Sequence, residues 1–251
     1  MRLLRDPSCS SVFMSIAENL ARVRERIDTA ARRAGRRSED VALMAVSKTF
    51  PADSIREAYE AGLRLFGENR VQEFAGKSDA LRNLDAAEWH LIGHLQTNKA
   101  AKAVELFSAV DSVDSLRLAQ KLNATAQQLK KKLQVLIEIN VGGETAKSGV
   151  APDSAELEHL LIVARELEHL EFRGLMTVPP FADDPREARP YFRKLRELRD
   201  QIAARRLPAI DMHTLSMGMS HDFEVAIEEG STCVRIGTAI FGSRTRDITT
   251  Q

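Results

Sequence analysis

Apolar runs and amphipathic stretches alternate along most of this chain. The first stretch, positions 15–34, repeats apolar residues at intervals of three and four and ends just before Gly35. That pattern predicts an amphipathic helix with a C-cap glycine. From position 41 onward, short apolar runs and helical patterns follow one another in turn, as they do in proteins built from βαβ units.

The apolar runs predict eight strands, at 41–48, 64–68, 89–93, 107–110, 134–141, 172–178, 213–216 and 234–240. The patterns between them predict helices at 52–61, 69–84, 97–106, 115–132, 152–170, 185–206 and 221–229. This alternation favours a closed (β/α)8 TIM barrel over an open sheet, and the 251-residue length suits one such domain. The tail after the last strand is too short and polar for a covering helix. We therefore expect the N-terminal helix to pack beside strand eight.

The composition narrows the class of protein. Hydrophobic residues make up 43% of the chain, enough for a large core, and the 36 basic residues balance the 36 acidic ones. This balance favours neither nucleic acid nor a membrane surface as a partner. Cys9 and Cys233 form no metal-ligand spacing, and no apolar run is long enough to span a membrane. We expect a monomeric cytoplasmic protein with one domain at 14–245 and a disordered extension at 1–13.

Lys48 stands at the far end of the first apolar run, VALMAVSKTF. A lysine at the end of a buried strand lies at the edge of the core, where loss of hydration lowers the pKa of an amine. A neutral amine can form a Schiff base with an aldehyde. The alternative is a strand-end lysine whose stem covers apolar surface while its amine reaches water.

The residues after strands seven and eight suit a phosphate group. The catalytic or binding ends of such barrels lie at the carboxyl ends of the strands, and these two loops often hold phosphate. Here they contain Ser216, Gly218 and Ser220, then Gly237 and Thr238. We expect Ser220 to cap a helix beginning at position 221. Ordinary turn chemistry is the alternative for both loops.

Arg235 lies between two apolar residues of the last strand, so strand alternation turns its side chain toward the barrel interior. A guanidinium keeps its proton, so it would donate to a ring nitrogen and leave that nitrogen unprotonated. Pairing with a core carboxylate such as Glu138 is the alternative.

Several separate motifs occur in one order along the chain. They are the Lys48 strand, GENRVQE, WHLIGHLQTNK, NVGGETAKSG, GLMTVPP, LSMGMSHDFEVAI and VRIGTAIFG. With them the sequence resembles the pyridoxal-phosphate homeostasis proteins from about position 15 to 244. The resemblance implies a single barrel like the alanine racemase N-terminal domain, with pyridoxal 5′-phosphate held as a Schiff base.

The resemblance also implies roles for individual residues. Lys48 matches the Schiff-base lysine, and Arg235 matches the residue that faces the pyridine nitrogen. The phosphate contacts match Ser216, Gly237 and Thr238, and Asn69 matches a residue that lines the cofactor pocket. His90 falls in a family motif without an assigned role.

The resemblance leaves more than one function open. A carrier would store the cofactor and deliver it to pyridoxal-phosphate-dependent apoenzymes, whereas a racemase or decarboxylase would act on amino acids. A two-base racemase needs a second acid/base group, a tyrosine in alanine racemase, and both tyrosines here, Tyr59 and Tyr191, fall in predicted outer helices. We therefore expect the carrier. A class I aldolase is a third possibility. We expect the charged loop with Glu144 and Lys147 to be solvated, and a loop that senses a second ligand is the alternative.

Overall fold

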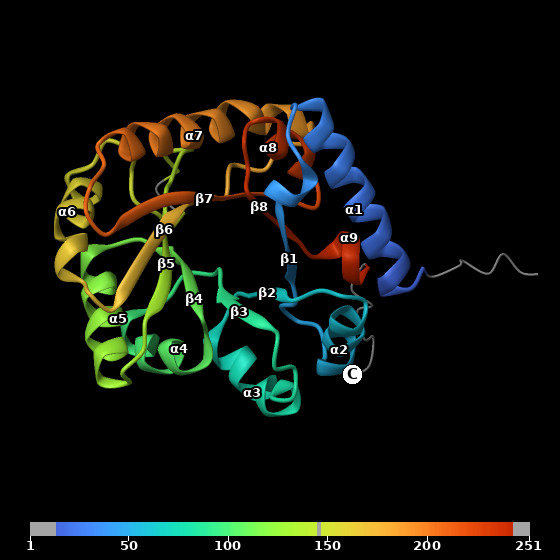
Figure 1. Cartoon of the computed structure of the whole chain (residues 1–251), viewed down its shortest axis with the longest axis horizontal. Coiled ribbons are helices and arrows are strands. Elements are labelled where there is room, and N and C mark those ends of the chain that lie inside the picture. Colours follow the sequence, from blue (N-terminus) through green and yellow to red (C-terminus); the bar gives the residue numbers. More distant parts are fainter. Residues whose placement is uncertain (1–13, 145–146, 243–251) are drawn as a thin grey trace, which may run out of the picture.

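Eight parallel strands close into a barrel in which each strand pairs with the next and the last pairs with the first (Figure 1). The computed structural model describes residues 14–144 and 147–242. The strands are β1 (Ala42–Val46), β2 (Leu65–Glu68), β3 (Glu88–Leu91), β4 (Ala109–Val113), β5 (Leu133–Glu138), β6 (Leu170–Met176), β7 (Ile210–Met219) and β8 (Cys233–Ile236). The predicted TIM barrel is confirmed. The predicted extension at 1–13 lies outside the described residues, as does the end of the predicted domain at 243–245.

Helices surround the barrel on its outer face (Figure 1). They are α1 (Ile16–Arg33), α2 (Ala52–Glu60), α3 (Val71–Leu81), α4 (Ala100–Leu106), α5 (Leu116–Gln128), α6 (Ala155–Val163), α7 (Arg189–Ala204), α8 (Phe223–Glu228) and α9 (Thr238–Phe241). Short 3₁₀ turns lie at Ser38–Asp40, Thr97–Lys99, Ala164–Glu166 and Pro185–Ala188. Within the described ranges, no helix has the length and apolarity to cross a membrane.

The barrel wall is buried from both sides, which is why the strands read as continuous apolar runs rather than alternating ones. In β1, for example, the last three residues, Met44 to Val46, are all apolar and buried. The side chains of Phe66 and Phe74 meet Trp89 in ring contacts with centroids 4.9 and 4.7 Å apart. This cluster holds α3 against the outer face of β2 and β3.

Helix α1 fills the position beside β8, as predicted. Ser15 and Glu18 form a capping box at its start, and Gly35, with a φ of 66°, follows its end. The Asn19 side chain donates to the Ile240 carbonyl of α9 at 3.0 Å, and Arg26 pairs with Glu224 of α8 at 2.6 Å. The N-terminal helix therefore covers the part of the wall that the last strand leaves open.

The last two strands differ from the prediction. Strand β7 continues to Met219, so Ser216 lies within the strand instead of the following loop. Strand β8 ends at Ile236, whereas the prediction extended it to position 240, and Gly237 instead precedes the single-turn helix α9. The apolar residues Ala239 and Ile240 pack toward α1 as part of that turn, so an apolar run did not mean a continuous strand here.

Candidate functional site

The six residues predicted for the site lie on or just after four adjacent strands. Five of them lie near the carboxyl ends, whereas Ser216 of β7 is level with Cys233, the first residue of β8. Strand β1 aligns with β8 so that Ala45 is level with Ile236, and with β2 so that Val46 is level with Gly67. The residues that follow these positions therefore share one rim. The predicted set comprises Lys48 after β1, Asn69 after β2, Ser216 in β7, Arg235 in β8, and Gly237 and Thr238 after β8.

Arg235 points into the barrel, as the alternation predicted, and is only 3% exposed. Its guanidinium donates to the Ser216 hydroxyl and to the Thr177 carbonyl, both at 2.7 Å. The alternative partner, Glu138, instead accepts a hydrogen bond from Ser148 at 3.0 Å. Burial lowers the pKa of Arg235, and the nearby Asp111, Asp222 and Glu138 act in the opposite direction. Arg235 is thus held in one orientation with further N–H donors left to offer.

The loops after β7 and β8 meet, but not as the sequence suggested. Ser220 does not cap α8, which begins after Asp222. Its hydroxyl oxygen instead accepts from the backbone N–H groups of Gly237 and Ala239, at 3.3 and 3.5 Å. Asp222 is buried, with its pKa raised by burial, and accepts from the Met219 N–H at 2.6 Å. Backbone donors, a hydroxyl and an acid therefore gather at this corner.

Across the mouth from β8, a cleft of about 340 Å³ extends from Asn69 past Gly93 and Glu138 to Val178. Gly93 allows the backbone of Asn69 to approach closely, since an added Cβ would lie 2.3 Å from the Asn69 carbonyl oxygen. The loop after β5 closes another side of this cleft. Lys147 pairs with Glu144 and donates to the Pro179 carbonyl at 3.2 Å, so one contact ties this charged loop to the neighbouring strand end while both side chains remain partly exposed, as expected.

Side chains of helix α3 form hydrogen bonds with the turn that carries Lys48. Lys48 is half-buried, and the next residue, Thr49, has a φ of 65°, a left-handed conformation that is costly for a β-branched residue. The Thr49 N–H donates to the Glu73 carboxylate. The Lys77 amine donates to the Ser47 carbonyl at 3.1 Å and to the Phe50 carbonyl at 3.4 Å. Two side chains of α3 thus fix the backbone on both sides of Lys48.

The same hydrogen-bond network includes Glu68 of β2, which is fully buried in the barrel wall. Its Oε1 accepts from the Ser47 hydroxyl at 2.6 Å and lies 2.8 Å from the Lys77 amine, whereas its Oε2 has no hydrogen-bond partner. Burial raises the pKa of Glu68, and the hydrogen bonds from Lys77 and Ser47 oppose this shift. Sequence analysis missed Lys77 and Glu73, because their spacing is that of any surface ion pair on a helix.

We expect Lys77→Met to destabilise the protein by about 3–5 kcal/mol at neutral pH, because it removes the cation from a buried carboxylate. The raised pKa of Glu68 means that its contribution to stability is present at low pH and lost as pH rises. The loss in Lys77→Met should therefore be larger at pH 8 than at pH 5. Urea denaturation at both pH values measures it.

The matched control for this substitution is Lys102→Met, which breaks an exposed pair with Glu105 on α4. Such a surface pair contributes less than about 1 kcal/mol. Equal unfolding free energies for the two variants would contradict a structural role for Lys77.

Glu138→Gln should stabilise the protein. Glu138 is buried, its Oε2 has no hydrogen-bond partner, and burial raises its pKa. A carboxyl whose pKa is raised by folding lowers the free energy of unfolding of the protein as pH rises. The glutamine keeps an acceptor for Ser148 without the charge, so we expect a gain of about 1 kcal/mol at pH 8 and little change at pH 4. Thermal unfolding at the two pH values checks it, and a loss at pH 8 would contradict it.

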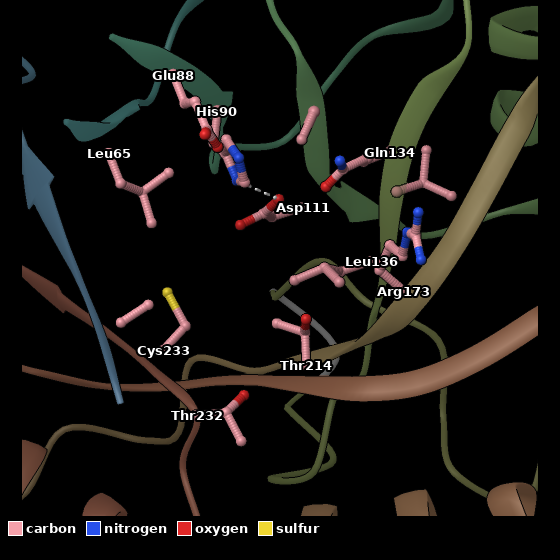
Figure 2. Close-up of a pocket in the computed structure, with 13 residues that line it drawn as sticks. Leu65, Glu88, His90, Asp111, Gln134, Leu136, Arg173, Thr214, Thr232 and Cys233 are labelled. Atoms are coloured by element: carbon pink, nitrogen blue, oxygen red, sulfur yellow. Dashed lines mark hydrogen bonds and ion pairs between the residues drawn. The ribbon is translucent and has the colours of Figure 1, made fainter. Parts of the chain in front are cut away.

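His90 lies at the opposite end of the barrel from Lys48. Its Nδ1 is 3.1 Å from the Asp111 Oδ1, and both residues line a cavity among the first residues of the strands (Figure 2). The structure therefore separates His90 from the six predicted residues. It adds Thr177 to their surroundings through its backbone carbonyl, which no side-chain pattern in a sequence can reveal.

Comparisons with known proteins place this chain in a family. The family model described as alanine racemase, N-terminal domain, matches residues 19–245. The pyridoxal phosphate homeostasis protein of Aquifex aeolicus (strain VF5) is 49% identical over 231 residues, which make up 92% of this chain and 99% of that protein. The protein of the same name from Escherichia coli (strain K12) is 46% identical over 236 residues, with coverages of 91% and 97%.

Solved structures agree. PipY of Synechococcus elongatus PCC7942 with PLP bound is 38% identical, has a TM-score of 0.79, and is matched over 91% of this chain and 100% of PipY. Alanine racemase of Clostridium difficile 630 is 17% identical with a TM-score of 0.67, over 94% of this chain and 59% of the racemase, a likeness of fold alone. This chain belongs to the family of the pyridoxal phosphate homeostasis proteins, which is built on the fold of the alanine racemase N-terminal domain.

Proposed function

We propose that this protein binds pyridoxal 5′-phosphate covalently and reversibly through Lys48 and acts in the storage, buffering and delivery of that cofactor. The observation that carries the proposal is that half-buried Lys48 follows β1, the strand paired with β8, and that Arg235 of β8 is held inside the barrel by Ser216 and Thr177. The names of the Aquifex and Escherichia relatives and the PLP-bound PipY structure support it. We expect the protein to act as a monomer in the cytoplasm.

The residues present fit such a cofactor. Arg235 offers N–H donors to a ring nitrogen and keeps its own proton, while Ser216 and Thr177 hold it in place. Gly237 and Thr238 would contact the phosphate, close to the backbone N–H groups that now donate to Ser220, whereas Ser216, the third phosphate contact that the resemblance implies, is fully buried and bonded to Arg235. Asn69 would line the pocket beside the cleft. When bound, the cofactor supplies an aldehyde carbon that a lysine amine can add to.

The same residues favour holding the cofactor over turning over amino acids. A guanidinium that donates to the ring nitrogen leaves it unprotonated, which weakens the ring as an electron sink. Tyr59 lies on α2, where the Arg64 guanidinium sits 4.1 Å above its ring, and Tyr191 lies on α7. Both tyrosines pack against the hydrophobic core from outer helices, which does not suit the second base of a racemase.

Visible spectroscopy tests the proposal. The purified protein, incubated with pyridoxal phosphate and freed of excess, should show a visible band that borohydride removes, and peptide mapping should locate the reduced adduct on Lys48. Incubation with an apoenzyme then tests delivery, which should restore activity to the apoenzyme. A colourless protein would overturn cofactor binding. Sustained racemisation of single amino-acid enantiomers would overturn the carrier in favour of an enzyme.

A further inference from the structure

A second cavity opens at the amino-terminal end of the barrel, opposite the rim that carries Lys48. Its volume is about 140 Å³. The residues that line it come from the first positions of nearly every strand, from Ala42 in β1 to Cys233 in β8. Figure 2 shows the side chains of Leu65, Asp111 and Cys233 pointing into one common space. Nothing in the proposed cofactor chemistry uses this space.

Asp111 is the polar group at the depth of the cavity and is only 1% exposed. Its Oδ1 is bonded to the His90 Nδ1 at 3.1 Å, but its Oδ2 is buried and has no hydrogen-bond partner. Leaving a buried carboxylate oxygen without a donor costs about 1–3 kcal/mol or more. A donor that entered the cavity, which Asp111 lines, would relieve this cost.

The charges around this mouth favour a cation. Glu88 lines the cavity together with Asp111, and the lining Arg173 pairs with Glu171 at 2.7 Å and Asp211 at 3.2 Å. His90 is a second cation; burial opposes its charged form, but the Asp111 charge and hydrogen bond raise its pKa overall. The charge of the buried Arg235 also acts on Asp111. Even with His90 protonated and Arg235 counted, the four carboxylates Glu88, Asp111, Glu171 and Asp211 outnumber the three cations. His213 approaches Asp211 from the exposed outer side.

The walls and the size narrow the ligand further. Much of the lining is apolar and offers no hydrogen bonds to water: Ala42, Leu65, Ala109, Val135 and Leu136. A cavity of about 150 Å³ accommodates benzene, so this one suits roughly six non-hydrogen atoms. The two carboxylates lie at different depths, Asp111 inside and the exposed Glu88 at the entrance. A short chain with a positive charge at each end matches both.

We propose that the amino-terminal mouth of the barrel binds a short linear alkyl diammonium ion. One ammonium donates to Asp111 Oδ2, the methylene chain packs along the apolar wall, and the second ammonium reaches Glu88. This site is separate from the cofactor rim and does not depend on it.

The test is calorimetric titration of the full chain, free of pyridoxal phosphate, with 1,4-diaminobutane. We expect saturable binding at one site, weaker binding of n-butylamine, and none of the neutral butane-1,4-diol. Asp111→Asn should weaken the diamine about tenfold or more, since it removes a charge-assisted hydrogen bond. Lys48→Ala should leave the affinity for 1,4-diaminobutane unchanged. That result would show that the diamine does not bind at the carboxyl end of the barrel, where Lys48 lies.

Ala42→Leu is a second variant, which narrows the cavity without changing any charge and should also weaken binding by about tenfold or more. It keeps the test decisive if Asp111→Asn proves unstable. The proposal is wrong if the wild-type protein gives no saturable signal, if the diol binds as well as the diamine, or if folded Asp111→Asn or Ala42→Leu binds like the wild type.

Discussion

Lys48→Ala should leave the protein folded but unable to acquire any visible band that borohydride removes. The reason is chemical, because alanine has no amine to attach the cofactor aldehyde. The surrounding backbone should persist, since Thr49, Ser47 and Phe50 are held by Glu73 and Lys77 and not through the Lys48 side chain alone. Visible absorption at saturating pyridoxal phosphate measures the loss, and circular dichroism checks the fold.

Lys102→Ala is the matched control, because this exposed lysine on α4 lies outside the candidate site. It should bind cofactor as the wild type does. A borohydride-sensitive band of full intensity in Lys48→Ala would place the attachment on another lysine and overturn the central assignment. Residual binding without that band would instead measure the affinity that Arg235 and the loops after β7 and β8 provide by themselves.

Arg235→Met is the second substitution with a large expected effect, on both stability and cofactor affinity. It takes the donors away from the Ser216 hydroxyl and the Thr177 carbonyl. It also removes the positive charge that acts on the buried carboxyls of Glu138 and Asp222. Removing one member of a buried charged group typically costs about 3–5 kcal/mol, so we expect a loss of that order.

The pH dependence of this loss follows from the two carboxyls. Burial already raises the pKa values of Glu138 and Asp222, and loss of the guanidinium should raise them further. A raised carboxyl pKa gives stability at low pH that disappears as pH rises through the folded pKa. The cost of Arg235→Met should thus be smaller at pH 5 than at pH 8.

Urea denaturation of Arg235→Met at both pH values tests this, with the exposed Arg82→Met as the control. Arg235→Lys keeps the charge without the planar fork and should fall between the wild type and Arg235→Met. An unfolding free energy of Arg235→Met that matches the control, or that rises with pH, would contradict the arrangement described for this residue.

The sequence was most informative where a residue's place follows from strand periodicity. Lys48 follows a strongly apolar strand and Arg235 stands within one. Order along the chain therefore predicted that Lys48 lies past the carboxyl end of its strand and that the Arg235 side chain faces inward. Ser220 was placed in the right loop with the wrong partner. A hydroxyl can bond to any nearby N–H, and the nearest ones belong to Gly237 and Ala239, which pass by only after the barrel closes.

The sequence by itself determined the barrel, because the alternation of buried strands and amphipathic helices can be satisfied by few other architectures. It also predicted that Lys48, Asn69, Gly237 and Thr238 follow the carboxyl ends of their strands. The tertiary structure decided which groups these residues contact. Lys77 bonds to the backbone of the Lys48 turn, and Arg235 bonds to the Thr177 carbonyl. It also formed the cavity that Asp111 lines. These contacts join positions far apart in the chain, and their geometry depends on barrel register and helix packing, which no local pattern encodes.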